Sequence, residues 1–200
     1  MGADRGVRWN HNIHYHRLVL DAIPDHARTA LDVGTGDGLL AAELRDRPLG
    51  VTAIDVDGDV LDRASAQVDG VQWVHGDVMT YSFGRQFDAV VSVATSHHLP
   101  DTRAALRRFA ELTAPGGVVA IVGLARTTRP SEVGMHLAGQ VQHRWLSWRR
   151  GYWEHSAPTV WPPRDSYRDV RRVADDELPG VCWRLLPMWR YALVWRKLTY

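Results

Sequence analysis

Residues 30–40 read Ala-Leu-Asp-Val-Gly-Thr-Gly-Asp-Gly-Leu-Leu, and this stretch decides the fold. A short apolar run ends in Gly34, Gly36 and Gly38, and a helical pattern of leucine and alanine follows directly. A strand, a tight glycine turn and a helix in this order form the nucleotide site of an open α/β sheet. Glycine permits positive φ angles and leaves room for a ligand against the backbone. The stretch therefore predicts a nucleotide-binding turn.

Further strands and helices follow the glycine turn. Apolar and β-branched runs at 51–55, 71–75, 87–94 and 118–124 predict strands, and helical patterns such as 58–68 lie among them. The run at 87–94 is the most continuous, which is typical of a central parallel strand buried on both faces. Because each parallel connection needs a crossover helix, the pattern predicts a Rossmann-like, doubly wound α/β sheet.

The C-terminal tail predicts a different pairing. Residues 181–186 and 191–197 have the pattern of strands joined at Pro187, and so short a connection requires antiparallel pairing. The length of 200 residues suits one domain with a single sizeable core. We therefore expect one domain over residues 1–200, divided into an N-terminal helical segment (1–29), a cofactor-binding core (30–125), an insertion (126–165) and a C-terminal helix and strand pair (166–200).

The composition limits which binding partners and which cellular compartment we expect. The net charge is +1, so no global electrostatic field favours nucleic acid. Cys182 is the single cysteine, which excludes an intrachain disulfide and agrees with a reducing compartment. No apolar run approaches the roughly 18 residues of a membrane span, and the N-terminus lacks the apolar core of a signal peptide. We therefore expect a cytoplasmic protein without a nucleic-acid partner or a stable membrane insertion.

Three histidines begin the helical pattern of the N-terminal segment. His11, His14 and His16 share their spacing with no cysteine or carboxylate, so the pattern does not favour a metal site, and we predict none. One alternative is a polar start of a helix. Another is a segment that folds over the ligand of the glycine turn.

The spacing of the glycines distinguishes between two kinds of nucleotide site. A dinucleotide fingerprint has the form G-x-G-x-x-G, whereas here the third glycine comes one residue early and Leu39 occupies the expected position. Asp32 lies two residues before the first glycine, where a carboxylate would repel a pyrophosphate but attract an ammonium or a sulfonium. S-adenosylmethionine carries both of these cations and no phosphate.

An acidic residue also ends the second strand. Asp55 follows the run Val51-Thr52-Ala53-Ile54 and lies 19 residues after Gly36, close to the spacing of about 20 that is expected for an acid that binds ribose hydroxyls. A carboxylate suits this role because it accepts hydrogen bonds from two neighbouring hydroxyls.

At this point the chain resembles the class I S-adenosylmethionine-dependent methyltransferases of the small-molecule type. LDVGTGDG (31–38) is similar to their first motif, AIDVD (53–57) to the acidic second motif, and GDV (76–78) to the adenine-contacting turn. FDAVVSVATSHHLPD (87–101) and LTAPGGVVAIVG (112–123) resemble their fourth and fifth strands. The resemblance covers roughly residues 30–125, in the right order and spacing. It implies a seven-stranded sheet, because the family also ends in an antiparallel strand pair.

The resemblance implies a role for each matching residue. Asp32 and the backbone of 34–38 would hold the methionine part of the cofactor, Asp55 the ribose, and Val56 the adenine. Asp77 would accept from the adenine amino group, with the Val78 amide nearby, and Ser92 would line the sulfonium side. The residues expected to bind S-adenosylmethionine are therefore Asp32, Gly34, Thr35, Gly36, Gly38, Asp55, Val56, Asp77, Val78 and Ser92.

Methyl transfer from a sulfonium needs a base only when the acceptor must lose a proton. His97 and His98 follow the central strand, where this fold places its chemistry, and histidine suits proton transfer near neutral pH. We take them as candidate catalytic residues. The alternative is that HHLP, a common run in the family, shapes the loop.

The insertion at 126–165 is rich in aromatic residues. Trp145, Trp148, Tyr152, Trp153 and Trp161 suggest that it forms a cleft for a small apolar or aromatic acceptor. Two other interpretations stay open at this point. The tryptophans can cover a sheet edge, or, with Arg144, Arg149 and Arg150, form a membrane-surface or partner contact. The same arginines could instead meet an acidic group of the substrate.

We therefore predict an S-adenosylmethionine-dependent methyltransferase with a small, apolar or aromatic acceptor. The asparagine-proline-proline-aromatic motif of amino-directed nucleic-acid methyltransferases is missing after the fourth strand, where Ala94-Thr95-Ser96-His97 stands. A protein acceptor stays open. Alternatives from other classes are a Rossmann-type oxidoreductase, which the glycine spacing disfavours, and a methyltransferase fold with a non-methylating or binding role.

Overall fold

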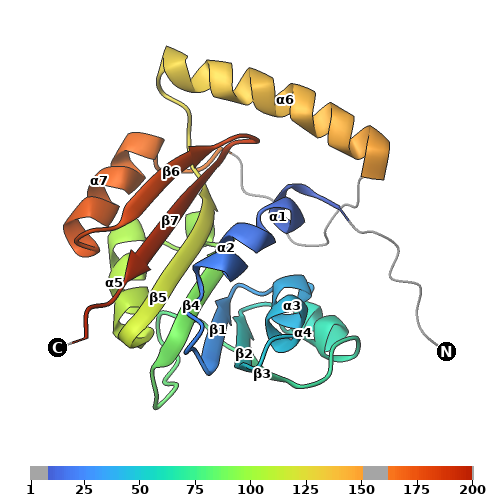
Figure 1. The fold of residues 1–200 in the computed structure, drawn as a ribbon, viewed down its shortest axis with the longest axis vertical. Helices are drawn as coiled ribbons and strands as arrows, with labels where there is room; N and C mark the ends of the chain where they lie inside the picture. Colours follow the sequence, from blue (N-terminus) through green and yellow to red (C-terminus); the bar gives the residue numbers. More distant parts are fainter. Residues whose placement is uncertain (1–8, 151–161, 200) are drawn as a thin grey trace.

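The chain forms one seven-stranded sheet with helices on both faces (Figure 1). The structure, a computed structural model, describes residues 9–150 and 162–199. The strand order is β3-β2-β1-β4-β5-β7-β6. The strands are β1 (Thr29–Val33), β2 (Gly50–Asp55), β3 (Val71–His75), β4 (Phe87–Val93), β5 (Thr113–Leu124), β6 (Cys182–Leu186) and β7 (Arg190–Arg196). The helices are α1 (His11–His14), α2 (His16–Ala22), α3 (Leu39–Arg45), α4 (Gly58–Ser65), α5 (Thr102–Leu112), α6 (Pro130–Arg150) and α7 (Tyr167–Glu177), with a 3₁₀ turn at Ser96–His98.

The pairing of the strands confirms the predicted fold class. β1 pairs in parallel with β2 and β4, β2 with β3, and β4 with β5. β7 pairs antiparallel with β5 and with β6. β4 is buried along almost its whole length, as its continuous apolar pattern predicts for a central strand.

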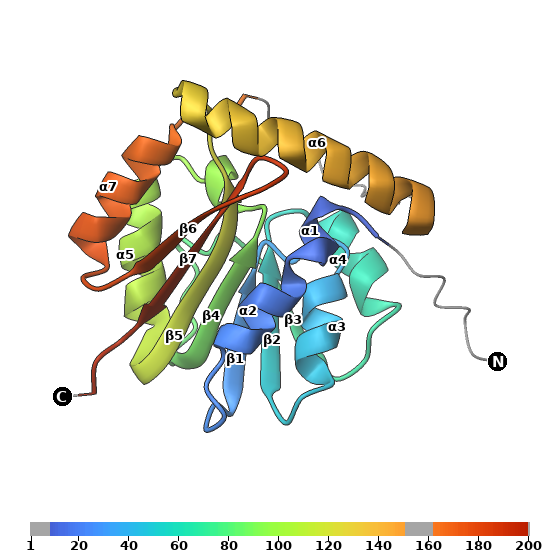
Figure 2. The ribbon, with the colours of Figure 1, turned by 45° about the horizontal axis from the view of Figure 1, so that its top comes forward.

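Two separate cores cover the faces of the sheet (Figure 2). On one face, α2 and α3 pack on alternate residues of the central strands, such as Ala30 and Val91. On the other face, α5 and α7 pack on the residues between them, such as Leu31 and Val90. The two sets follow the twofold alternation of side chains along a strand, so each central strand contributes to both cores.

Several boundaries differ from the sequence prediction; α4, for example, ends at Ser65 and not at Val68. The N-terminal helix breaks at Tyr15 into α1 and α2, and the buried Tyr15 hydroxyl donates to the Pro187 carbonyl across the molecule. β5 begins at Thr113 instead of Val118, because the Pro-Gly-Gly sequence continues the strand with a shift in register against β4. Gly116 adopts φ +78° there, a conformation that glycine tolerates.

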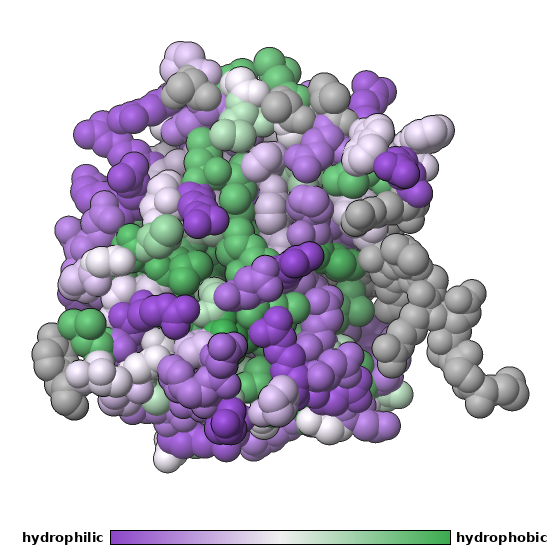
Figure 3. All heavy atoms as spheres, viewed as in Figure 1, coloured by the Kyte–Doolittle hydropathy of each residue, from purple (hydrophilic) through white to green (hydrophobic). Residues whose placement is uncertain are grey.

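Helix α6 lies apart from the two layers, across the end of the sheet at which the β6–β7 turn lies (Figures 1 and 2). A Cβ on Gly139 would lie 2.5 Å from the Met188 amide nitrogen, so the helix approaches the turn backbone to backbone. Leu146 is the described residue of α6 in the core on the α2–α3 face. In Figure 3, hydrophilic residues predominate along the left and lower edges of the molecule.

In the described parts of the chain, no helix combines the length and the apolar character that a membrane crossing requires. The cytoplasmic location stays a prediction.

An ion-pair cluster joins the two helices of the second face. Glu177, near the end of α7, accepts hydrogen bonds from Arg103 and Arg107 of α5, with a distance of 2.5 Å from the Arg107 Nε. The hydrogen bond from Arg107, followed by that from Arg103, lowers the pKa of Glu177. Both arginines are accessible, so solvent weakens the individual pairs, but two cations share one carboxylate.

We expect Glu177→Gln to lower the free energy of unfolding at pH 7. A carboxyl whose pKa is depressed by folding stabilises the protein above its unfolded pKa of about 4.3, and this contribution is lost as the pH falls through the folded pKa. Urea unfolding of both proteins between pH 7 and pH 3 should therefore show a difference that shrinks toward acid. Glu111→Gln, which removes an exposed i,i+3 pair with Arg108, is the control and should change little. A difference that is independent of pH would contradict the role of the Glu177 charge.

Candidate functional site

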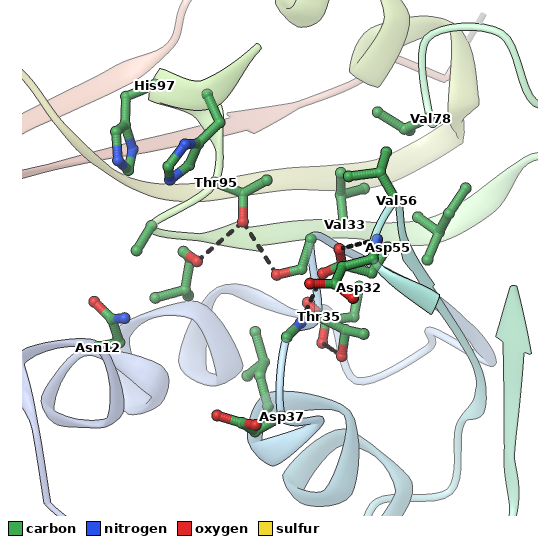
Figure 4. Close-up of a pocket in the computed structure, with 18 of the residues that line it drawn as sticks. Asn12, Asp32, Val33, Thr35, Asp37, Asp55, Val56, Val78, Thr95 and His97 are labelled. Atoms are coloured by element: carbon green, nitrogen blue, oxygen red, sulfur yellow. Dashed lines mark hydrogen bonds between the residues drawn. The ribbon is translucent and has the colours of Figure 1, made fainter. Parts of the chain in front are cut away.

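A cavity of about 540 Å³ opens at the carboxyl ends of the parallel strands (Figure 4). Its volume lies in the usual range of small-ligand sites. The glycine turn after β1, the end of β2, the turn after β3 and the loop after β4 all contribute to its wall. This is the position at which open α/β sheets bind their ligands, because the chain reverses its strand order between β1 and β4.

The glycine turn is held to the end of β2 by its own backbone. The amides of Gly34 and Thr35 both donate to the Ile54 carbonyl, at 2.8 and 3.2 Å. Gly34 has φ +69°, and a Cβ there would lie 2.1 Å from the Thr95 side chain. The Thr95 hydroxyl donates to the Gly34 carbonyl at 3.1 Å (Figure 4). The absence of a side chain at Gly34 therefore lets the loop after β4 close over the turn.

Asp32 places a buried carboxyl under the turn. It is 1% exposed, and the Thr35 hydroxyl donates to its Oδ2 at 2.7 Å. Burial raises its pKa to about 6, while the Thr35 hydrogen bond and the charge of His16 act in the opposite direction. At pH 7 the group is therefore mostly ionised and attracts a cation in the cavity, as the sequence argument requires.

Asp55 connects the glycine turn to the start of α4. Its Oδ2 accepts from the Gly36 amide at 2.9 Å and its Oδ1 from the Asp57 amide at 3.1 Å. Figure 4 shows Asp55 beside Asp32 and Thr35, on the side of the cavity that Val56 and Val78 also line. Each carboxylate oxygen has a second lone pair that can accept from a ligand hydroxyl.

Two valines form an apolar wall at this end of the cavity. Val56 is 67% exposed although it is a large aliphatic residue, and Val78 is buried. Asp77 also lines the cavity, and its Oδ1 accepts from the Met79 amide at 2.9 Å. An exposed valine beside a carboxylate is suited to a flat, partly polar ring such as adenine.

Gly38 and Ser92 were among the residues expected to bind the cofactor, but neither lines the cavity. The Ser92 hydroxyl is buried and donates to the Val33 carbonyl at 3.0 Å, which joins β4 to the end of β1. Gly38 begins α3 with φ +72°, and a Cβ there would lie 2.7 Å from the Trp73 ring. Both residues therefore support the glycine turn from the side that faces away from the cavity.

His97 and His98 lie over the opposite side of the cavity, with ring centroids 4.0 Å apart. Burial, followed by the charges of His98 and Arg190, lowers the pKa of His97 to about 3. Burial also lowers the pKa of His98. Both rings are therefore neutral at pH 7 and can accept a hydrogen bond, but a proton transferred to His97 would be held weakly.

The backbone after β4 is strained where it turns toward these histidines. Ala94 adopts φ +58°, which is unfavourable for a residue with a side chain, and its amide donates to the Val122 carbonyl at 2.7 Å. Strain of this kind collects at functional sites. The turn at Ala94 places Thr95 and the 3₁₀ turn that contains His97 over the cavity.

The N-terminal segment closes one side of the cavity. Asn10, Asn12, Ile13 and His16 all line it, so the segment lies against the ligand site, one of the alternatives left open by the sequence. His16 is buried and its Nδ1 lies 2.8 Å from the Glu43 Oε1. Among the residues that the structure describes, no three His, Cys, Asp or Glu side chains cluster as a metal site would require.

The described part of the insertion does not line the cavity. Trp145 and Trp148 are 51% and 82% exposed on α6, and neither belongs to the lining. The helix presents them to solvent because its inward positions are taken by Leu146 and Glu132. Tyr152, Trp153 and Trp161 lie outside the described residues. The division of the chain that gives 126–165 an acceptor role stays a prediction.

Sequence reasoning missed several lining residues. Leu124 ends β5, Pro100 follows the histidines, and Arg190 begins β7. Leu124 and Pro100 lie within or next to the recognised motifs. Arg190 has no local signal at all, because only the antiparallel pairing of β7 with β5 brings it to the carboxyl ends of the parallel strands.

A family model described as a methyltransferase domain matches residues 31–121. A protein of Mycobacterium tuberculosis described as an uncharacterized methyltransferase is 41% identical over 191 residues, which cover 94% of this chain and 96% of that protein.

More local matches reach proteins with different acceptors. A ubiquinone biosynthesis O-methyltransferase of Erwinia tasmaniensis is 32% identical over 123 residues, covering 56% of this chain and 51% of its own. A tRNA (adenine-N6)-methyltransferase of Vibrio vulnificus is 32% identical over 74 residues, covering 33% and 31%. Among solved structures, a TehB-like S-adenosylmethionine-dependent methyltransferase of Corynebacterium glutamicum has the same fold, with a TM-score of 0.60 at 18% identity, covering 91% of this chain and 86% of that one.

We expect Gly38→Ala to destabilise the protein more than Gly84→Ala does. Both glycines have positive φ, which costs an alanine roughly 1–2 kcal/mol. At Gly84 the added Cβ meets nothing within 4 Å, whereas at Gly38 it overlaps the Trp73 ring and approaches Ala64. Urea unfolding should therefore give a clearly larger loss for Gly38→Ala. Equal losses would mean that close packing at Gly38 is unimportant.

Proposed function

This chain belongs to the class I S-adenosylmethionine-dependent methyltransferases, and we propose that its acceptor is a small, largely apolar molecule. The enzyme therefore transfers a methyl group, and S-adenosylmethionine is its cofactor. One observation carries the proposal for the acceptor. Besides the carboxylates Asp32 and Asp55, the apolar side chains of Ile13, Leu99 and Leu124 line the same cavity. Apolar lining residues of this kind suit the apolar body of a small acceptor.

The chemistry of the donor set fits the cofactor. The buried, mostly ionised Asp32 suits the cationic methionine part, next to the open backbone of the glycine turn. Asp55 retains acceptor capacity for the ribose hydroxyls, and Val56 and Val78 offer the adenine an apolar contact. Asp77 and the Val78 amide are the proposed partners of the adenine polar edge.

The cofactor supplies an electrophilic methyl group on a good leaving group, so the protein contributes mainly position and a dry site. Asn12 and Ile13 close the cavity from the N-terminal side, and Leu99 and Pro100 close it from the loop after β4. His97, neutral at pH 7, accepts a hydrogen bond from the acceptor and orients it. It takes a proton only from an acceptor acidic enough for so weak a base.

We do not propose a nucleic-acid acceptor for this enzyme. The similarity to the tRNA methyltransferase spans a third of the chain, and the motif typical of amino-directed nucleic-acid enzymes is replaced after β4 by Ala94 and Thr95. The similarity to the ubiquinone O-methyltransferase spans 56% of the chain and agrees with a small acceptor. The net charge of +1 also gives no attraction to a phosphate backbone.

We expect Asp55→Ala to weaken the binding of S-adenosylhomocysteine by roughly tenfold or more, because the variant loses hydrogen bonds to a charged acceptor. Isothermal titration calorimetry measures this directly, with Asp59→Ala, an exposed acid of α4 away from the cavity, as the matched control. Unchanged affinity of Asp55→Ala would refute the ribose assignment. Binding of NAD in place of S-adenosylhomocysteine would refute the cofactor assignment.

We expect His97→Gln to lower turnover far more than cofactor affinity. A glutamine amide keeps a hydrogen-bonding group at the position but cannot take up a proton, so a loss of about 10²-fold or more indicates proton transfer and a smaller loss indicates orientation. Methyl-labelled S-adenosylmethionine and a metabolite screen provide the assay, and His98→Gln tests the neighbouring ring. Wild-type turnover of His97→Gln would remove His97 from the mechanism.

A further inference from the structure

Helix α6 packs on the rest of the protein along one side only. Its buried positions include Glu132, His136 and Leu146, which lie on the same side of a helix with about 3.6 residues per turn. Figures 1 and 2 show α6 as the outermost element at this end of the sheet. The opposite side of the helix, its outward side, is where a surface helix normally carries polar residues.

The outward side of α6 carries large apolar residues instead. The exposed fractions are 46% for Val133, 58% for Leu137, 51% for Trp145 and 82% for Trp148. These are four of the seven strongly exposed large hydrophobic side chains in the described parts of the chain. At helical spacing they form a stripe on the side of α6 that faces away from Leu146. Apolar residues gathered in this way, on a helix already packed by its other side, mark an interaction surface.

The charge beside this stripe is positive. Arg144 and Arg149 are exposed, and the Arg149 guanidinium lies 4.9 Å from the centre of the Trp145 ring. The one carboxylate of the α6 sequence, Glu132, is on the buried side, where it accepts hydrogen bonds from two backbone amides of the turn before the helix. Among the α6 side chains that the structure describes, the outward side therefore combines tryptophan with arginine and has no negative charge.

This combination fits the surface of an anionic membrane. Tryptophan prefers the boundary between lipid headgroups and acyl chains, since its ring is apolar and its N–H can donate to polar groups. Arginine attracts anionic headgroups, and its guanidinium pairs with phosphate oxygens. Helices that lie flat on membranes have aromatic and aliphatic residues together with arginine or lysine.

A second copy of this chain fits the same surface less well. A twofold contact would bring the outward sides of two α6 helices together, because each copy contributes the same patch. Arg144 and Arg149 would then meet the same arginines of the other copy, with no carboxylate of α6 between them. Like charges in an interface oppose association.

We propose that the outward side of α6 docks the protein reversibly on an anionic membrane. Trp145 and Trp148 enter the headgroup region, and Arg144 and Arg149 contact the lipid phosphates. A contact of this kind lies in the membrane surface and needs no spanning helix. It is independent of the acceptor proposed above, because the α6 residues that form it do not line the cavity.

Co-sedimentation of the protein with lipid vesicles tests this surface. One set of vesicles is phosphatidylcholine alone, and the other is equal parts of phosphatidylcholine and phosphatidylglycerol. We expect the wild type to bind the mixed vesicles roughly tenfold or more tightly, and to lose this preference at high salt, since the attraction of two arginines is screened. Arg144→Gln/Arg149→Gln should lose the preference. Trp145→Ser/Trp148→Ser should bind the mixed vesicles roughly tenfold or more weakly than the wild type.

Arg17→Gln/Arg171→Gln is the matched control. It removes two exposed arginines from α2 and α7 and changes the net charge equally, so it should bind the mixed vesicles as the wild type does. The proposal is overturned if the wild type does not bind the mixed vesicles, if it binds the neutral vesicles equally well, or if both α6 variants bind as the wild type does.

Sedimentation velocity without lipid tests the other occupants. We expect a monomer for the wild type and for both α6 variants. A dimer that dissociates in Trp145→Ser/Trp148→Ser would assign the surface to a second copy, and a monomer that binds neither kind of vesicle would leave it to a protein partner. Either result overturns the membrane assignment. The affinity for S-adenosylhomocysteine, measured on the same samples, should stay unchanged in the α6 variants, so a loss of vesicle binding is not mistaken for a failure to fold.

Discussion

The two hydrogen bonds that Gly34 and Thr35 donate to the Ile54 carbonyl are the constraint on which the site depends. They end β1 and β2 at a common point and turn the chain away from the sheet, so that a space opens above the strand ends. Asp55 then reaches back to the Gly36 amide, and Thr95 closes over Gly34 from β4. Each later contact uses the position that these two bonds set.

Buried charge is the second organising feature of the cavity. Asp32 and Arg190 are both almost inaccessible, so hydrogen bonds must replace the water that each side chain loses on folding. The Thr35 hydroxyl donates to Asp32, and the Arg190 guanidinium donates to Asn12 and to the Met188 carbonyl. The carboxylates that line the cavity favour a cationic ligand such as the sulfonium cofactor.

The N-terminal segment and α6 together support one wall of the cavity. His11 of α1 lies 2.8 Å from His143 of α6, measured between the Nε2 and Nδ1 atoms, and Trp9 stacks on the same His143 at 5.9 Å. These contacts fix α1, whose Asn12 and Ile13 line the cavity. The histidine-rich start of the chain, which the sequence alone left between three interpretations, is thus part of the wall. The aromatic residues of α6 that seemed suited to an acceptor pocket on composition alone, Trp145 and Trp148, face solvent.

The sequence by itself determined the fold class, the cofactor and the approximate positions of most strands and helices. Hydrophobic periodicity and glycine spacing act over a few residues, so they can be recognised along the chain. The same short range explains why Asp32, Asp55 and Val78 could be predicted as cofactor residues, since each belongs to a local motif. Only the tertiary structure decided that Ser92 and Gly38 lie outside the lining of the cavity, and that Arg190 belongs to it. Those roles depend on which strand lies beside which, and the antiparallel return of β7 next to β5 is a long-range packing outcome that no local pattern records.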